Sequence, residues 1–319
     1  MKKIITLLIL VSGLSAHAEF GVSAGASFNY KADFRSSMQS LGYANNPGAP
    51  VAGVDHFYDD GYNRVDSSGN DGNLTSYWGY QNASQDNGGS VTMSSKQTLI
   101  DSSSFSREQS EAQPAFEFYW QQDLTENQRW NIGLRAALRW QHIDVDSLTT
   151  RGTTIQTTSD TYPGEGIPPG APFSGSYSGP NFLLSDIAAR DASYASGTSF
   201  LSMRELEADL FALDFGPTFS YNFTEKLRLS ASIGGTVAWL NSDFTYRDGP
   251  FGQGRASENE WLLGAYAGAD LSYRLGDRWG LFGGAAYTCL EDSTQEIDGR
   301  SASFQFDDSY TVRFGLFFR

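Results

Sequence analysis

The sequence predicts an all-β fold, an antiparallel up-and-down barrel of eight strands. Two observations predict it: apolar and polar side chains alternate over many segments, and the connections between these segments alternate between short and long. A period of two is the pattern of a strand with one apolar face. No stretch of useful length has the period of a helix, so the parallel sheet of an α/β enzyme is not predicted.

Each expected strand carries a row of apolar residues at every second position. The first row is Phe20, Val22, Ala24, Ala26, Phe28 and Tyr30, with Gly, Ser, Asn and Lys residues between. The other rows lie in 116–120, 130–140, 206–223, 227–239, 261–275, 279–287 and 310–318. Within 206–223 the apolar row moves from even to odd positions, which predicts a β-bulge between Leu210 and Leu213.

The connections predict which strands meet at each end of the barrel. Three are short, at 124–128, 224–226 and 276–278, and all lie at one end. Four are long, at 32–109, 147–203, 245–259 and 292–307. Within the first long loop, 74–81 and 91–101 are expected to pair as a hairpin; as two further membrane strands they would make a ten-stranded barrel. The stretch 182–190 in the second long loop is compatible with a short helix.

The first 18 residues predict export. Lys2 and Lys3 precede an apolar run over 4–14, and Ala16-His17-Ala18 has the form of a cleavage site, which together indicate a signal peptide. The mature chain would be a single barrel domain over 19–319, with large loops at about 32–109 and 147–203. A formal charge of -15 disfavours nucleic acid as a partner, and the single cysteine, Cys289, excludes an internal disulfide.

Aromatic side chains favour an apolar face that contacts lipid. Trp130 and Trp140 lie about 33 Å apart along a strand, and a tilt of roughly 40° reduces this to about 25 Å, the height of a membrane barrel's apolar band. The residues expected in two aromatic girdles are Phe20, Tyr30, Trp120, Trp130, Trp140, Trp239, Trp261, Tyr273 and Trp279.

The opposite face carries charges that would need a wet or paired interior. The expected lumen residues are Glu117, Arg135, Arg139, Glu205, Glu207, Asp209, Asp214, Arg228, Asp270, Arg274 and Arg313. Eight strands leave room for side chains and not for an open channel, so a paired polar plug is predicted. A gate, in which arginines exchange carboxylate partners to pass small ions, is the alternative.

The strand pattern, the leader and the last strand together resemble the small outer-membrane β-barrels of Gram-negative-type bacteria, typified by the outer membrane protein A membrane domain and outer membrane protein X. That family's assembly signal is a final strand with a polar residue, a glycine and terminal aromatics, and Arg313, Gly315 and Phe318 match it. Arg319, which follows, departs from the pattern. The resemblance implies location in the outer membrane, with membrane lipid and the barrel-assembly machinery as partners.

No motif for catalysis, a cofactor or a metal stands out, so a non-enzymatic protein that uses surface loops for interaction or envelope structure is predicted. A narrow pore for small solutes is the alternative, and a membrane-embedded hydrolase is a third hypothesis. His142, near Asp144, Asp146 and Ser147, is the histidine best placed for hydrolysis; it is expected at the lipid interface. His56 is expected in a solvated loop.

The first long loop allows two further hypotheses. Its Asp, Asn and Gly density over 58–73 suggests calcium, but the spacing fails the EF-hand pattern, so turn chemistry is preferred. Tyr77, Trp78 and Tyr80 are either exposed recognition aromatics or, as expected, packed within the folded loop.

Overall fold

The computed structural model describes residues 18–319 except 110–111, 126, 128, 180–181 and 307. The predicted leader therefore lies, apart from Ala18, outside the described residues. The chain divides into two compact units, each described by itself below. The barrel unit comprises the chain up to Ser36 together with Ser104–Thr149 and Leu201–Arg319; the insert unit comprises Ser37–Ser103 and Thr150–Phe200.

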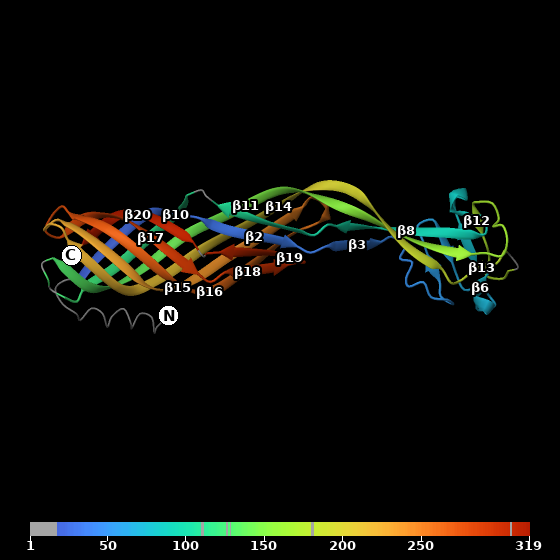
Figure 1. Cartoon of the computed structure of the whole chain (residues 1–319), viewed down its shortest axis with the longest axis horizontal. Helices are drawn as coiled ribbons and strands as arrows, with labels where there is room; N and C mark the ends of the chain where they lie inside the picture. Colours follow the sequence, from blue (N-terminus) through green and yellow to red (C-terminus); the bar gives the residue numbers. More distant parts are fainter. Residues whose placement is uncertain (1–17, 110–111, 126, 128, 180–181, 307) are drawn as a thin grey trace. The chain divides into compact units, whose positions relative to one another are not determined.

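The barrel unit is a closed ring of antiparallel strands. The ring strands are β1 (Ala18–Phe28), β10 (Gln113–Asp123), β11 (Trp130–Pro163), β14 (Ala189–Asn222), β15 (Leu227–Asp248), β16 (Gln253–Arg274), β17 (Trp279–Leu290) and β20 (Ser309–Phe318). They follow the order β10-β1-β20-β17-β16-β15-β14-β11, and pairing of β10 with β11 closes the ring (Figure 1). These strands contain the eight predicted alternating segments, so the predicted fold class is confirmed.

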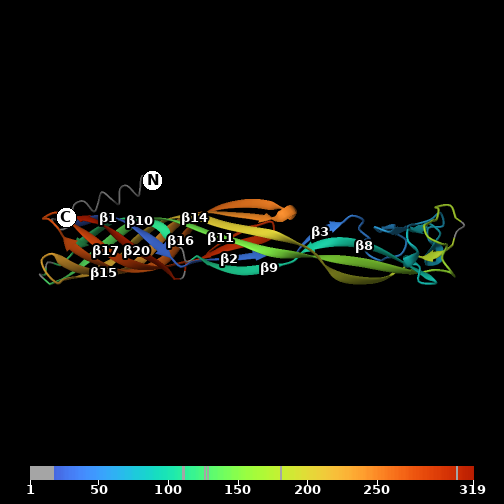
Figure 2. The same ribbon diagram turned by 90° about the horizontal axis from the view of Figure 1, so that it is seen from above.

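A smaller sheet also belongs mainly to the barrel unit. Its order is β18-β19-β2-β9, with β18 (Ser293–Ile297), β19 (Arg300–Gln305), β2 (Tyr30–Ser36) and β9 (Ser103–Gln109). Figure 1 labels β2, β18 and β19, and Figure 2 shows β2 beside β9. Much of what was predicted as loop is therefore strand. The helical segments of the described chain are the three-residue 3-10 turns η2 (Asp71–Asn73), η3 (Ala83–Gln85) and η4 (Gly249–Phe251). None of the described helices could cross a membrane.

The two faces of the barrel wall exchange character along the strands. Near the short turns the outer face is apolar and the inner face polar. Toward the long connections the inner face becomes an apolar core, and the outer face becomes polar. Members of this core are Tyr30, Ala32, Phe34, Ile143, Val145, Leu206, Ala208, Leu210, Ala212, Ala238, Leu240, Phe244, Tyr246, Leu262, Leu290, Ala302, Phe304 and Phe306.

This exchange corrects the predicted bulge in β14. Leu210 faces Leu240, Leu213 faces Val237 and Asp214 faces Thr236, so the β14–β15 register runs through the segment without a shift. Even-numbered residues of β14 stay buried from 200 to 220. The strand keeps the same face inward throughout. The apolar side chains move from the inner face to the outer face because the interior is apolar toward the long connections and polar toward the short turns.

Tyr30 is a second correction. It was expected in the outer girdle, but its side chain is fully buried in the inner apolar core, and its hydroxyl donates a hydrogen bond to Gln141. Asn29, between β1 and β2, has a φ of 68°, in the left-handed region that Asn tolerates better than most residues. The interrupted alternation turns Tyr30 inward.

The insert unit consists of short sheets around its own aromatic core. One sheet has the order β12-β7-β5-β4, formed by Phe173–Ser174, Trp78–Tyr80, Gly61–Asn63 and His56–Phe57, and β13 (Leu184–Ser185) pairs with β6 (Leu74–Thr75). β8 (Ser90–Ile100) pairs with the 153–163 part of β11 and with β3 (Gln39–Tyr43). The core contains Tyr58, Trp78, Tyr80, Val91, Met93, Tyr162 and Leu184.

These pairings overturn two local expectations. The segments 74–81 and 91–101 do not pair with each other, because each finds a partner in the second long loop instead. Nor are they strands of the closed ring. The described residues of 182–190 are not helical, since Leu184–Ser185 forms β13 and β14 begins at Ala189.

Candidate functional site

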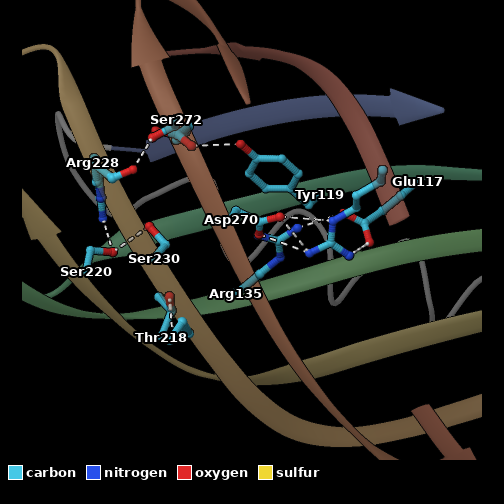
Figure 3. Close-up of polar contacts among 12 residues, drawn as sticks. Glu117, Tyr119, Arg135, Thr218, Ser220, Arg228, Ser230, Asp270 and Ser272 are labelled. Carbon is cyan, nitrogen blue, oxygen red and sulfur yellow. Dashed lines mark hydrogen bonds and ion pairs between the residues drawn. The ribbon is translucent and has the colours of Figure 1, made fainter. Parts of the chain in front are cut away.

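The barrel lumen contains four charged side chains that neutralise one another. Arg135 Nη2 lies 2.7 Å from Glu117 Oε1, and its Nη1 lies 2.7 Å from Asp270 Oδ2. Arg313 Nη1 lies 2.7 Å from Glu117 Oε2, and its Nη2 lies 3.0 Å from Asp270 Oδ2. Each arginine therefore bridges both carboxylates. We call Glu117, Arg135, Asp270 and Arg313 the lumen quartet (Figure 3).

The quartet links distant strands across the lumen, because its members come from different parts of the ring. Glu117 is on β10, Arg135 on β11, Asp270 on β16 and Arg313 on β20. All four side chains are almost fully buried. Gly284 faces Asp270 across β16 and β17, and a Cβ at Gly284 would collide with that carboxylate. A glycine is thus required where the carboxylate folds over the neighbouring strand.

Two further arginines extend the polar interior on either side of the quartet. Arg139 donates to Thr288 Oγ1 at 2.9 Å, and its Nη2 lies 3.8 Å from Asp214. Nearer the short turns, Arg228 donates to both oxygens of Asp123 and to Ser220, which shares a hydrogen bond with Ser230 (Figure 3). The lumen is therefore filled by hydrogen-bonded side chains over much of its length.

Four of the predicted lumen residues do not lie in the lumen network. Glu205, Glu207 and Asp209 are odd-numbered residues of β14 and lie partly exposed on its outer face. They were predicted to face the lumen because the apolar even-numbered row of this segment was expected to face lipid. In the structure that even-numbered row faces the inner apolar core. Arg274 is half-buried at the end of β16, beside the short turn.

The outer carboxylates gather beside β11. Oxygens of Asp144, Glu205 and Glu207 lie within 4.8 Å of one another, the one group of this kind among the described residues. Burial raises the pKa of Asp144, and the charge of Glu207 raises it further. His142 Nδ1 lies 3.1 Å from Asp209, and both side chains are substantially exposed. The described contacts of His142 thus include a carboxylate but no serine.

His56 differs from expectation, because it is buried and not solvated. Its Nδ1 lies 2.8 Å from the carbonyl oxygen of Pro47, and its Nε2 lies 3.0 Å from that of Val51. The ring holds the segment before β4 in place. Both nitrogens are engaged by backbone, so the geometry is structural.

The outer surface of the ring carries the remaining predicted girdle residues. Phe20, Trp130, Trp239, Trp261, Tyr273 and Trp279 are exposed, and Trp120 and Trp140 are half-buried on the same face. Ring contacts join neighbouring strands at the end away from the short turns: Phe116 with Trp140, Trp239 with Trp261, and Tyr287 with Tyr310. We call the outward apolar surface from these pairs down to the short turns the apolar band.

The last strand places the residues of the proposed assembly signal on both faces. Arg313 and Gly315 point inward, and Phe318 is half-exposed on the apolar band. Arg319, the departure from the family pattern, is 2.7 Å from Glu19 and lies over the ring of Phe317.

The insert unit holds an open cleft of about 390 Å³. It is lined by Phe57, Tyr62, Arg64, Tyr77, Ser174, Gly175, Ser176 and Tyr177. The guanidinium of Arg64 lies over the rings of Phe57 and Tyr77, and its Nε donates to Asp55 at 3.0 Å. Of the three aromatics expected to pack within the loop, Trp78 and Tyr80 are buried in the core, whereas Tyr77 lines this cleft.

Sequence reasoning missed several participants. Tyr119 donates to Glu19, and Arg135 lies 4.1 Å from the Tyr119 ring centroid; the odd-numbered position of Tyr119 on the polar face of its strand was the available signal. Asp123, which accepts hydrogen bonds from Arg228, was not among the predicted lumen residues. Asp248, which binds both Arg204 and Arg300, gave no signal, because these residues lie in what the sequence presents as loops or loop edges.

No family model matches the chain, and no curated protein sequence matches it. Among solved structures it is similar to the outer membrane protease OmpT of Escherichia coli, with 10% identity over 96% of this chain and 98% of that chain and a TM-score of 0.37. It is also similar to Ail, the attachment invasion locus protein of Yersinia pestis, with 9% identity, coverage of 95% and 100%, and a TM-score of 0.30. The translocator domain of the autotransporter NalP of Neisseria meningitidis shares 12% identity, with coverage of 100% and 94% and a TM-score of 0.22.

These likenesses concern architecture, and at such low identities and TM-scores they carry no argument about activity. One expectation is nevertheless corrected. The chain was predicted not to be an enzyme, yet OmpT is a protease that aligns along nearly the whole chain, so a fold of this kind does not exclude catalysis. In its architecture the chain is an all-β antiparallel barrel similar to these outer-membrane proteins, with a lumen crossed by ion pairs.

Proposed function

We propose that this chain is an integral outer-membrane protein whose barrel is a closed anchor and whose insert unit serves as a binding module outside the cell. The observation that carries the proposal is the opposite character of the two faces of one wall. Large apolar side chains are exposed around the band, among them Trp261, Phe314 and Ile233 at 62–65% exposure, while the lumen side holds the buried quartet. Such a surface is costly in water and suited to lipid.

The orientation follows from the connections. In outer-membrane barrels the short turns face the periplasm and the long connections face outward. The insert unit consists of Ser37–Ser103 and Thr150–Phe200, and both segments lie within the long connections. The proposed partners are outer-membrane lipid at the apolar band and the barrel-assembly machinery at the last strand, through Arg313, Gly315 and Phe318.

A closed lumen is favoured over the narrow pore. A path for ions through the lumen would require the quartet to separate. Each of its buried arginines pairs with two carboxylates, and an unpaired buried charge costs about 3–5 kcal/mol. The proposed barrel therefore anchors and does not conduct.

Three measurements test the proposal, the first two of them on the mature protein refolded in detergent. Migration on a denaturing gel should shift on boiling, and planar lipid bilayers containing the protein should show no stable single-channel currents. Solubility without detergent would contradict the membrane anchor, and reproducible currents would favour the pore. In intact cells that express the chain, added protease should cleave within 37–103 or 150–200; protection of both segments would contradict the outward orientation.

A further inference from the structure

The cleft of the insert unit has a fixed wall. The guanidinium of Arg64 lies over the ring of Phe57 and over the ring of Tyr77, at 5.3 and 4.7 Å from the ring centroids. Its Nη1 donates to the Tyr77 hydroxyl at 2.9 Å. Tyr77 in turn packs edge-on against both Tyr62 and Tyr177. The aromatic rings are therefore positioned before any ligand arrives, which limits the entropy lost on binding.

The backbone beneath the rings is also fixed. The Tyr62 hydroxyl bonds with Ser174 Oγ at 2.7 Å, and the Ser67 amide donates to the Tyr177 carbonyl. Gly175 is buried against the 76–78 backbone, where a Cβ would collide with the carbonyl oxygen of Ser76. Two separate loops are thus joined into one surface, with β5 and β7 on one side and the 174–177 segment on the other.

Three groups on this surface remain directed to solvent. Phe57 and Tyr177 are 44% and 57% exposed, so their rings offer faces to a ligand. Within the described part of the chain, neither the Tyr177 hydroxyl nor Nη2 of Arg64 has a hydrogen-bond partner. Exposed aromatic faces beside hydroxyl and guanidinium donors suit a ligand that has an apolar C–H face and a rim of hydroxyl groups. A pyranose ring has both.

Charge restricts the ligand further. The insert unit contains eleven Asp and Glu residues against four Lys and Arg residues. Arg64 is the one charged residue lining the cleft, and Asp55, at 3.0 Å, offsets its charge. An acidic unit without a basic patch at its cleft repels sulfated, phosphorylated and uronic acid polymers. A volume of about 390 Å³ lies at the lower end of the roughly 300–1,000 Å³ usual for small-ligand pockets.

From these contacts we infer that the aromatic cleft around Arg64 and Tyr177 binds neutral carbohydrate, with a sugar ring stacked on Tyr177 and its hydroxyls bonded to Arg64 and Tyr177. The inference concerns the insert unit alone, so it does not require the barrel to lie in a membrane.

The test titrates the full chain in detergent with four neutral probes: cellotetraose, maltotetraose, chitotetraose and galactobiose. Saturation-transfer NMR and calorimetry should detect saturable binding of at least one. Tyr177→Ala should weaken that binding by at least about tenfold, the size expected for one aromatic stacking contact. Tyr177→Phe should retain most of it, since the ring remains. The matched control is Tyr194→Ala, which removes a similarly exposed tyrosine of the same unit that does not line the cleft.

Each contrary result overturns the inference. Absence of binding to all four probes removes neutral carbohydrate as the ligand. Equal losses in the Tyr177 and Tyr194 variants remove the cleft as its site. Tighter binding of a heparin fragment, or displacement of the sugar by a tryptic digest of casein, assigns the cleft to an anionic polymer or a peptide. Gel migration with and without boiling, measured on the same sample, reports on the membrane anchor separately.

Discussion

Single residues in the lumen are stabilised by partners that come from distant parts of the chain. Arg313 and Arg135 lie between the same two carboxylates, so the removal of one arginine leaves two negative charges facing one positive charge. The cost arises from desolvation that is no longer compensated, more than from a lost hydrogen bond.

Arg313→Leu should therefore lower the free energy of unfolding by about 3–5 kcal/mol. The double variant Arg313→Leu with Glu117→Leu restores the charge balance and should lose less than the sum of its single variants. Urea unfolding in detergent micelles measures all three. Val312→Ala, on the outward face of the same strand, is the control; strictly additive losses would show that the quartet does not act as a unit.

In the insert unit, Asp66 gives a pH-dependent prediction. Burial alone would raise its pKa, but hydrogen bonds from the amides and hydroxyls of Ser68 and Ser76 outweigh burial and lower the pKa to about 2. Because the folded pKa lies below the unfolded value of 3.8, the stabilisation is complete above pH 3.8 and is lost as the pH falls toward 2. It amounts to about 2 kcal/mol.

Hydrogen exchange over 65–76 should accordingly increase as the pH falls through this range, after correction for the intrinsic exchange rate. Asp66→Asn should remove the increase and leave the segment less protected at every pH. Asp71→Asn, at an exposed acid in the same loop, should behave like the parent chain. An unchanged pH profile in the Asp66 variant would rule out this carboxylate as the cause.

Among the elements, β14 shows how far alternation alone can predict a structure. Its period of two identified the strand correctly, because one face is always drier than the other. The pattern could not tell which face is outside, since in the proposed membrane anchor the outer face would meet lipid at Leu213 and water at Leu201, both of which are exposed. The same limit explains Tyr30, Glu205, Glu207 and Asp209, whose positions depend on surroundings supplied by other strands.

Two matched substitutions on β14 test this exchange. Leu213 and Leu201 both lie on the outer face, with 51% and 60% exposure. Leu213→Arg places a charge in the apolar band and should cost about 2–4 kcal/mol when folding is measured in lipid vesicles, whereas Leu201→Arg should change stability by less than about 1 kcal/mol. Equal costs would mean that the band does not end between these residues.

For the whole molecule, the sequence predicted the closed ring and the charged interior but not the insert unit. The ring could be predicted because each strand carries its own signal and pairs mostly with its sequence neighbour. The short strands that join the two loops of the insert unit pair across about 100 residues, as Tyr80 with Phe173 and Thr75 with Leu184, and two- or three-residue strands carry no periodicity. The aromatic cleft could not be predicted because its walls come from both loops.

The insert unit has a separate core, so damage there should leave the barrel intact. Trp78 is fully buried and contacts Tyr80, Phe173 and Phe182. Trp78→Ala should cost about 3–5 kcal/mol locally and make protease cleavage within 37–103 and 150–200 faster than in the parent chain, while the shift on boiling persists. Trp130→Ala, on the apolar band, is the control for loss of a tryptophan. Loss of the boiling shift in the Trp78 variant would contradict independent cores.

The exchange of faces along the wall also bears on the kind of bilayer the protein would prefer. β15 and β16 have 22 residues each, but the rows that need lipid end at Trp239 and Trp261. Hydrophobic mismatch is therefore set by the height of this band and is independent of the full strand length. Lengthening the water-facing part of the wall would leave the preferred bilayer thickness unchanged, whereas moving the tryptophans by one pair of residues would alter it.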